Sequence, residues 1–227
     1  MKKGILIVFE GLDYSFKETN CKKLYEYIKS TTDKVELLSF PNYDNESSIF
    51  VKNYLSGKYG KSSEVDPYQS SMFYAMDRYD TIYNLNIKEK LEDGYIIIMD
   101  RYIGSNLIFQ STKFNDDNMT NNYIQSMSDF EYHVLGLPKE DIVIYMNMPI
   151  DISYELMKER KLKSGEDTDG HEDNYEFMKK VEENAKKIID KLGYTVVDCV
   201  NKDNTIRTKE EIFNNILSEV EGFIRLH

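Results

Sequence analysis

Short apolar runs recur along the chain, and longer polar segments separate them. The runs are Ile5–Phe9, Val35–Phe40, Tyr95–Met99, Ile142–Met146 and Tyr194–Val200. Tyr95–Met99 and Ile142–Met146 are continuous and rich in β-branched residues, which is typical of strands that are buried on both faces of a parallel sheet. The polar segments are long enough for crossover helices. The alternation therefore predicts an α/β fold in which helices flank a doubly wound parallel sheet.

Three other segments have patterns of their own. In Thr208–Leu226, apolar residues recur at helical spacing, which predicts an amphipathic closing helix. The polar stretch Asn115–Asn122 is expected to be a loop, and the charge-dense, glycine-containing stretch Lys158–Asn174 is expected to be mobile. The chain has 227 residues and no internal repeat, so a single domain over residues 1–227 is predicted.

Charge and cysteine usage narrow the function classes. The net charge of −11 argues against a protein that binds duplex nucleic acid, which needs a basic face. It leaves room for a nucleotide enzyme whose positive charge lies in one cleft. Cys21 and Cys199 lack metal-ligand spacing and fit core positions in a reduced, cytoplasmic protein. No apolar run reaches the length of a membrane span, and Glu10 ends the first run too early for a signal peptide.

The segment Gly11–Thr19 follows the first predicted strand and nearly matches the phosphate-binding consensus G-x-x-x-x-G-K-[ST]. Gly11 and Lys17 have the consensus spacing, and a helix is predicted from Lys17 to about Ile28. A strand, a tight turn and a helix start form the context that a phosphate cradle requires, because backbone N–H groups converge on the anion there. The sequence therefore predicts a nucleotide-phosphate site at this turn.

The same segment departs from the consensus at two positions. Phe16 stands where the second glycine is expected, Glu18 stands where the hydroxyl is expected, and Thr19 lies one position late. A glycine lets the backbone wrap closely around phosphate, because it has no Cβ. If this position needs a positive φ, a non-glycine residue costs about 1–2 kcal/mol. The phenyl ring could also crowd the N–H groups, so an adapted loop and an impaired loop both stay open.

A second candidate lies directly after the run Tyr95–Met99, where the sequence continues Asp100-Arg101-Tyr102. A carboxylate at a strand end can hold Mg²⁺, and an adjacent arginine can clamp a phosphate bidentately. Alone, such a pair is often a simple salt bridge. Ligands of doubly wound sheets bind at the carboxyl ends of the strands, so these residues are expected to face the same crevice as the phosphate loop.

Together, these motifs resemble the thymidylate kinases of the P-loop nucleoside monophosphate kinase group. The matching pieces occur in the family's order over almost the whole chain: Phe9–Asp13 with Lys17, Phe40–Tyr43, Phe73–Arg78, Asp100–Tyr102 with Ser105 and Asn106, Gly136–Pro138, and a charged lid around Arg160. The resemblance implies a three-layer P-loop kinase fold with a mobile lid at about residues 158–174. It also implies ATP-dependent phosphorylation of dTMP to dTDP, with ATP and Mg²⁺ as cofactors, by a homodimer.

The resemblance further implies roles for individual residues. The implied ATP-binding residues are Gly11, Phe16, Lys17, Glu18 and Thr19, and the implied Mg²⁺ ligands are Asp100 and Glu18. The implied dTMP-binding residues are Asp13, Tyr74, Arg78, Arg101 and Asn106. The implied catalytic group is Lys17, Asp13, Arg101 and Arg160. In this scheme Tyr74 stacks on thymine, Arg101 clamps the dTMP phosphate, and Arg160 closes over the transferring phosphoryl group.

Simpler interpretations stand beside these roles. Tyr74 could be core on an apolar helix face, Arg78 could pair with Asp77 or Asp80 on a solvated surface, and Arg160 could belong to a solvated charge run. Two functional alternatives also remain. The first is a nucleotide-binding homologue with impaired catalysis, and the second is a kinase for another monophosphate such as dUMP or a modified pyrimidine nucleotide.

Overall fold

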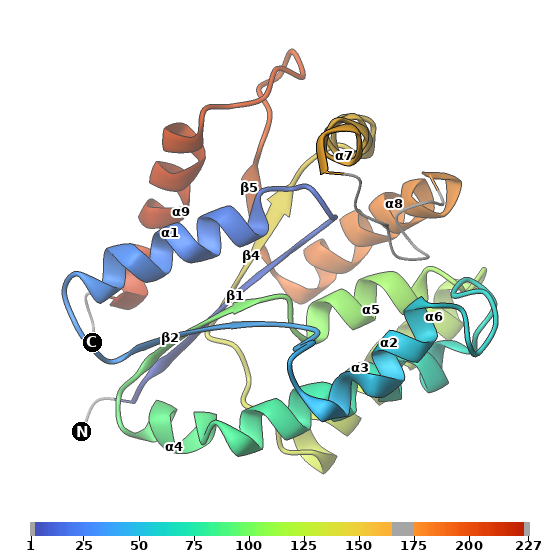
Figure 1. Ribbon diagram of the computed structural model, residues 1–227, viewed down its shortest axis with the longest axis horizontal. Helices are drawn as coiled ribbons and strands as arrows, with labels where there is room; N and C mark the ends of the chain where they lie inside the picture. The colour runs from blue at the N-terminus through green and yellow to red at the C-terminus, as the bar shows by residue number, and fades with distance from the viewer. Residues whose placement is uncertain (1–2, 165–174, 225–227) are drawn as a thin grey trace.

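The computed structural model describes residues 3–164 and 175–224. Its sheet has the strand order β2-β3-β1-β4-β5, and all neighbouring strands are parallel (Figure 1). The strands are β1 (Ile5–Gly11), β2 (Val35–Ser39), β3 (Ile96–Asp100), β4 (Ile142–Asn147) and β5 (Thr195–Asp198). All five predicted strands are confirmed, with small shifts at their ends, and so is the parallel α/β architecture.

Helices cover both faces of this sheet (Figure 1). They are α1 (Lys17–Lys29), α2 (Ile49–Leu55), α3 (Pro67–Asn84), α4 (Ile87–Glu92), α5 (Ile103–Ser111), α6 (Asp117–Asp129), α7 (Ile150–Ser164), α8 (Tyr175–Leu192) and α9 (Lys209–Ile224). A 3₁₀ turn (Glu46–Ser48) precedes α2, and a π-helical turn (Phe130–Val134) continues α6. The helices predicted after the phosphate loop and at the C-terminal end are both confirmed.

Two apolar clusters sandwich the sheet. One lies between the sheet and α1 and α9, and it contains both Cys21 and Cys199 as buried free thiols. The other lies between the sheet and the helices α3, α5, α6 and α8. Every residue of the central strand β1 is buried, as expected for a strand that is covered on both faces. No helix within the described ranges is both long enough and apolar enough to span a bilayer.

The loop predicted at Asn115–Asn122 is wrong, because α6 occupies most of it. The Asp116 side chain accepts a hydrogen bond from the Met119 backbone N–H at 2.9 Å and caps the helix. The apolar face of α6 comes mainly from the later residues Tyr123, Ile124 and Met127, which are buried. The first turns carry asparagines, an aspartate, Thr120 and the exposed Met119, and none of these side chains is buried, so a window that ended at Asn122 contained almost none of the amphipathic signal.

The predicted lid segment divides into two parts. Residues 158–164 continue α7 as helix, so this part is not an irregular stretch. Residues 165–174 lie outside the described residues.

The register brings the carboxyl ends of the strands together. Asp100 pairs with Phe9 of β1 on one side and with Ser39 of β2 on the other, and Gly11 pairs with Met146 of β4. The phosphate-loop segment and the Asp100-Arg101 pair therefore leave the sheet at the same edge.

Candidate active site

The phosphate loop joins β1 to α1 through several left-handed backbone positions. Gly11 has φ +143°, and a Cβ there would lie 2.7 Å from the Met146 carbonyl oxygen, so only glycine fits. Tyr14 and Phe16 also have positive φ, at 56° and 64°. Phe16 therefore has the positive φ that the consensus glycine would adopt freely.

Phe16 is anchored on two sides. Its carbonyl oxygen accepts hydrogen bonds from the backbone N–H and the Nδ2 of Asn20, at 3.1 Å and 2.9 Å. Its half-buried ring packs against the apolar cluster beneath α1 and α9. The ring therefore has core contacts of its own, although it also borders the cavity over the loop.

The loop encloses the side chain of Lys17. Its buried Nζ donates hydrogen bonds to the Leu12 carbonyl oxygen and, at 3.3 Å, to Ser15 Oγ. Burial lowers the pKa of Lys17, whereas the nearby carboxylates of Asp13 and Asp100 oppose the shift. The ammonium group of Lys17 is thus held inside the loop, next to the loop backbone.

Asp100 is the carboxylate best placed for a metal ion. Its side chain is buried, and Oδ1 has no hydrogen-bond partner among the described residues. Burial raises the pKa of Asp100, although Lys17 and Arg101 oppose the shift. Magnesium in nucleotide sites commonly takes one or two carboxylates together with substrate phosphates, and an unpartnered oxygen beside the phosphate loop fits that donor set.

Glu18 fits that role less well than predicted. Its carboxylate is 2.5 Å from Lys22 Nζ, one helical turn along α1, and the side chain is two-thirds exposed. Its hydrogen bond with Lys22 lowers the pKa of Glu18. The described residues contain no group of three His, Cys, Asp or Glu side chains that could hold a metal ion.

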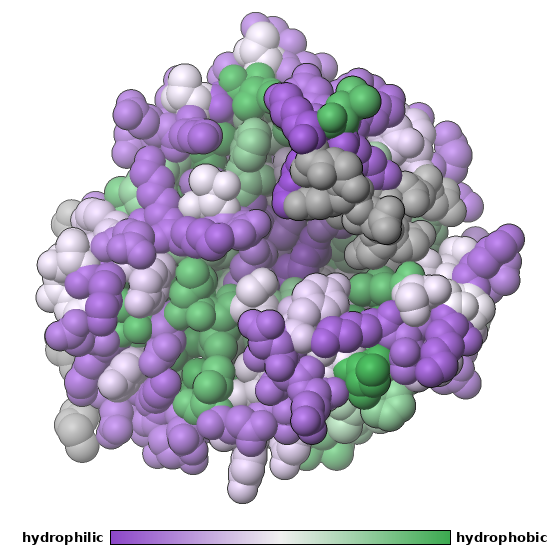
Figure 2. All heavy atoms as spheres, viewed as in Figure 1, coloured by the Kyte–Doolittle hydropathy of each residue, from purple (hydrophilic) through white to green (hydrophobic). Residues whose placement is uncertain are grey.

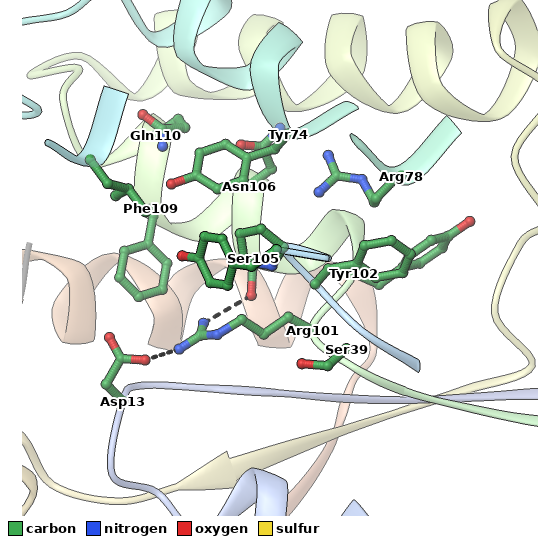
Figure 3. A pocket seen from close by; sticks show the side chains of 14 residues that line it. Asp13, Ser39, Tyr74, Arg78, Arg101, Tyr102, Ser105, Asn106, Phe109 and Gln110 are labelled. Carbon is green, nitrogen blue, oxygen red and sulfur yellow. Dashed lines mark hydrogen bonds and ion pairs between the residues drawn. The ribbon is translucent and has the colours of Figure 1, made fainter. Parts of the chain in front are cut away.

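Arg101 connects the loop to α5. It has φ +66°, and its guanidinium donates hydrogen bonds to Asp13 and, at 3.1 Å, to Ser105 Oγ (Figure 3). A third hydrogen bond, of 3.3 Å, goes to the Gly11 carbonyl oxygen. Asp13 and Arg101 thus form an ion pair at the mouth of the loop. An incoming phosphate would meet a guanidinium that is already oriented.

Glu10, which had no predicted role, sets the start of α5. Its buried carboxylate accepts hydrogen bonds from the backbone N–H groups of Tyr102 and Ser105, both at 2.9 Å, and from Ser105 Oγ at 2.5 Å. Burial raises the pKa of Glu10, and the hydrogen bonds from Ser105 and the charge of Arg101 oppose the shift. A carboxylate at a helix N-terminus also interacts favourably with the helix dipole.

Two cavities open at this edge of the molecule and share Asp13 and Arg101. The loop cavity, of about 370 Å³, is lined by the phosphate loop, Asp100 and Arg160. The aromatic cavity, of about 280 Å³, carries the rings of Phe40, Tyr43, Tyr74, Tyr102 and Phe109 and the polar groups of Arg78, Asn106 and Gln110. Figure 2 shows a hydrophilic hollow near the centre of this face, below α7.

Arg78 lines the aromatic cavity, and the alternative interpretation of a solvated pair with Asp77 or Asp80 is wrong. Neither Asp77 nor Asp80 binds it. The side chain is 2% exposed, and Nε and Nη2 donate to the two carboxylate oxygens of Glu131 at 2.7 Å and 2.6 Å. Glu131 lies in the π-helical turn, 53 residues away along the chain. No local spacing in the sequence could have shown this partner.

Asn106 presents an acceptor beside Arg78. Its Nδ2 faces the Ser71 carbonyl oxygen at 3.2 Å and a Glu131 carboxylate oxygen at 3.5 Å. Both neighbours are acceptors, so they determine which way the amide points. Oδ1 is buried and has no partner among the described residues. An unpaired buried acceptor is costly unless a ligand donor reaches it.

Gln110 is a cavity residue that the sequence reasoning missed. It lies one helical turn after Asn106 on α5, so the i, i+4 rule could have placed the two on one face. Its Oε1 accepts a hydrogen bond from Ser70 Oγ at 2.7 Å.

The remaining predicted residues also reach the cavities. Tyr74 is half-buried and lines the aromatic cavity, and its ring packs edge-on against that of Tyr54, with 6.0 Å between the ring centres. Its stacking on thymine stays a prediction. Thr19 is exposed beside the loop cavity. The guanidinium of Arg160, on α7, lies 5.9 Å from the centre of the Tyr14 ring and faces the loop, which differs from a purely solvated charge.

Comparisons with known proteins agree with this geometry. A family model described as thymidylate kinase matches residues 9–212. The chain belongs to the thymidylate kinase family. The human thymidylate kinase is 30% identical over 149 residues, which cover 66% of this chain and 63% of that protein. A putative thymidylate kinase of Invertebrate iridescent virus 6 is 33% identical over 144 residues, which cover 63% of this chain and 60% of that protein.

Longer matches come at lower identity. The thymidylate kinase of Danio rerio is 24% identical over 229 residues, which cover 99% of this chain and 93% of that protein. The solved thymidylate kinase of Candida albicans has a TM-score of 0.70 at 20% identity, with 97% of this chain and 92% of that chain covered. That likeness establishes the thymidylate kinase fold for this chain.

Phe16 allows a paired test of the loop. In Phe16→Gly, relief of the left-handed conformation should offset the lost ring contacts, so the free energy of unfolding should change by less than about 1 kcal/mol. Phe16→Ala loses the ring without that relief, so we expect it to destabilise the protein by about 2 kcal/mol. Urea unfolding measures both, and equal losses in the two variants would contradict the argument.

The Arg78–Glu131 pair allows a second test. Glu131→Ala leaves the Arg78 cation buried without a counter-charge, and we expect a loss of about 3–5 kcal/mol in the free energy of unfolding. The double variant Arg78→Met with Glu131→Met removes both charges and should recover most of that loss. Denaturant unfolding of the two variants would refute a buried pair if the double variant were the less stable one.

Proposed function

We propose that this chain phosphorylates dTMP to dTDP with ATP as the phosphate donor. The main support for the proposal is that the two cavities share part of their lining. The loop cavity suits a nucleotide triphosphate, the aromatic cavity suits a nucleobase, and Asp13 and Arg101 belong to both. A phosphoryl group that passes between the cavities would cross at these two residues.

The residues around this wall suit phosphoryl transfer. That reaction depends mainly on alignment and charge neutralisation, because the acceptor is a substrate phosphate and needs no side-chain nucleophile. The Lys17 ammonium lies inside the loop, and the Arg101 guanidinium lies where the two cavities meet. The Arg160 guanidinium approaches the loop from α7. Bound Mg²⁺ would neutralise further charge on the ATP phosphates, with Asp100 as its protein ligand. The alternative of an impaired homologue gains no support from these positions.

The aromatic cavity also suits a pyrimidine with two carbonyl groups. Such a base presents an acceptor, a donor and an acceptor along its O4–N3–O2 edge. Arg78 offers donors, Asn106 Oδ1 is an acceptor with no partner in the part of the chain that the structure describes, and Gln110 turns Nε2 away from Ser70. In the view of Figure 3, Asn106 lies between Arg78 and Gln110. This donor–acceptor–donor order would disfavour cytosine, whose edge differs at N3 and at the exocyclic amine.

The test is ADP production with ATP, Mg²⁺ and dTMP, with dUMP, dCMP and dGMP in parallel. We expect turnover that requires dTMP, and Asn106→Ala should lower kcat/KM for dTMP by about 10–100-fold, mainly through KM. Asn122→Ala, on the exposed face of α6, is the matched control and should behave as the wild type. dTMP binding without turnover would overturn the kinase and favour the impaired homologue. Equal turnover of dTMP and dUMP would favour the broader substrate class.

We further propose a homodimer, formed in the cytoplasm, through an apolar stripe on α3. Met72, Tyr79 and Tyr83 are exposed and recur at helical spacing, and the exposed ring of Phe50 on α2 stacks on Phe73 beside them. The two buried free thiols fit a reducing compartment. The stripe supports self-association, because an exposed patch of this kind on a stable chain commonly marks an interface.

A charge on the stripe should separate the protomers. The double variant Met72→Glu with Tyr79→Glu is expected to run as a monomer in sedimentation velocity, because it would bury unpaired carboxylates at the interface. Ile206→Glu, placed just before α9 on the other side of the sheet, should leave the mass unchanged. If the wild-type protein is a monomer at micromolar concentration, the homodimer proposal is wrong.

A further inference from the structure

The chain that follows β2 forms one wall of the aromatic cavity. The cavity is lined there by Ser39, Phe40, Pro41 and Tyr43, and we call these four residues the β2 wall. The loop cavity contains none of them, because its lining comes from the phosphate loop, from the chain around the end of β3 and from α7. The position of the β2 wall should therefore affect a ligand of the aromatic cavity and leave a ligand of the loop cavity unaffected.

Helix α3 lines the same cavity and is joined to the β2 wall. It supplies Tyr74 and Arg78 to the cavity lining. Asp77 lines neither nucleotide cavity and bonds instead to the segment after β2. Its Oδ2 accepts a hydrogen bond from the Asn42 backbone N–H at 2.8 Å, and its Oδ1 accepts one from Ser47 Oγ at 3.3 Å. Because Asn42 lies within the stretch that forms the β2 wall, the first bond fixes the backbone of that wall.

The Asp77 side chain is buried, and each of its carboxylate oxygens accepts a hydrogen bond. Burial raises the pKa of Asp77, and the hydrogen bond from the Asn42 N–H opposes the shift. A hydrogen bond from a backbone N–H to an ionised carboxylate is roughly twice as strong as one between neutral groups. The Asp77 carboxylate therefore holds the Asn42 backbone more firmly than a neutral acceptor would.

Two asparagine side chains add contacts between this segment and α3. Asn42 Nδ2 donates to Thr81 Oγ1 at 3.3 Å, and Asn45 Nδ2 donates to Thr81 Oγ1 and to Asp80 Oδ2, both at 3.0 Å. Thr81 lies four residues after Asp77, so the two acceptors share one face of α3. Asp80 and Thr81 thus hold side chains of the segment, whereas Asp77 holds the backbone of the β2 wall.

We propose that Asp77 is a positioning residue for the nucleoside monophosphate. By holding the β2 wall against α3, it fixes one side of the aromatic cavity in the place that dTMP binding requires, and it leaves the ATP site unaffected. The proposal rests on the proposed function, since it assigns dTMP to the aromatic cavity and ATP to the loop cavity. Asp77 touches neither nucleotide in this scheme.

The experiment measures Kd by calorimetry, separately for dTMP and for a non-hydrolysable ATP analogue with Mg²⁺, so that it does not depend on turnover. In Asp77→Ala the bond to the Asn42 backbone is lost, and we expect Kd for dTMP to rise roughly tenfold, the worth of about one hydrogen bond. Asp77→Asn keeps an acceptor for the Asn42 N–H but loses the charge, so the rise should be only about threefold. Kd for the ATP analogue should stay within about twofold of the wild-type value in both variants.

Asp80→Ala is the matched control. It removes a carboxylate from the same helix, and Asn45 keeps its bond to Thr81, so both Kd values should stay within about twofold of the wild type. Hydrogen exchange of the nucleotide-free protein gives a second readout. The peptide that covers residues 40–48 should exchange faster in Asp77→Ala than in the wild type, whereas the phosphate-loop peptide should not change.

The outcomes also distinguish the positioning role from the proposed function. Wild-type protein that fails to bind dTMP would overturn the proposed function itself. If the wild type binds dTMP, the positioning role alone is wrong when Asp77→Ala binds dTMP as tightly as the wild type, or when it weakens both ligands equally, as a general loss of stability would. Equal exchange of residues 40–48 in Asp77→Ala and the wild type, or an equal loss of dTMP affinity in Asp80→Ala, would also contradict it.

Discussion

The buried carboxylate of Glu10 is the contact on which the site depends. It joins the end of β1 to the first turn of α5 by accepting hydrogen bonds from two backbone N–H groups and one hydroxyl. Burying a carboxylate costs several kcal/mol unless such donors surround it. Ser105, which Glu10 holds, also binds Arg101, and α5 carries Asn106 and Gln110 one turn apart. One strand-to-helix contact thus fixes the positions of residues that line the loop cavity and of residues that line the aromatic cavity.

The aromatic cavity depends on a second buried charge. Glu131 pairs with Arg78 through both carboxylate oxygens, and one of those oxygens also faces the Asn106 amide. The pair is costly to bury, and its stabilising value depends on complete hydrogen bonding. Here the same carboxylate orients a donor and an acceptor that face one cavity. Glu131, which does not line the aromatic cavity, therefore maintains the geometry of two residues that do.

Much of the fold and part of the site could be predicted from the sequence. The buried strands and the helix after Gly11–Thr19 were predictable because they are local patterns, in burial periodicity and in loop spacing. Helix α6 was missed because its apolar residues come late, and Glu131 was missed because it meets Arg78 only through the tertiary fold. Gln110 could have been predicted, because it lies four residues after Asn106 and therefore on the same helix face. The orientation of the Gln110 amide could not be predicted, because its oxygen bonds Ser70, which lies 40 residues away along the chain.

In the phosphate loop, the left-handed backbone expected at the consensus glycine is retained although the residue differs from the consensus. The glycine expected at position 16 would supply a left-handed backbone, and Phe16 adopts that backbone with φ +64°. Its carbonyl oxygen accepts hydrogen bonds from Asn20, and its half-buried ring packs against the apolar cluster beneath α1 and α9. These contacts can compensate the strain of about 1–2 kcal/mol. The left-handed backbone that a glycine would adopt freely at position 16 is here held in place by the Asn20 hydrogen bonds and by the packing of the ring.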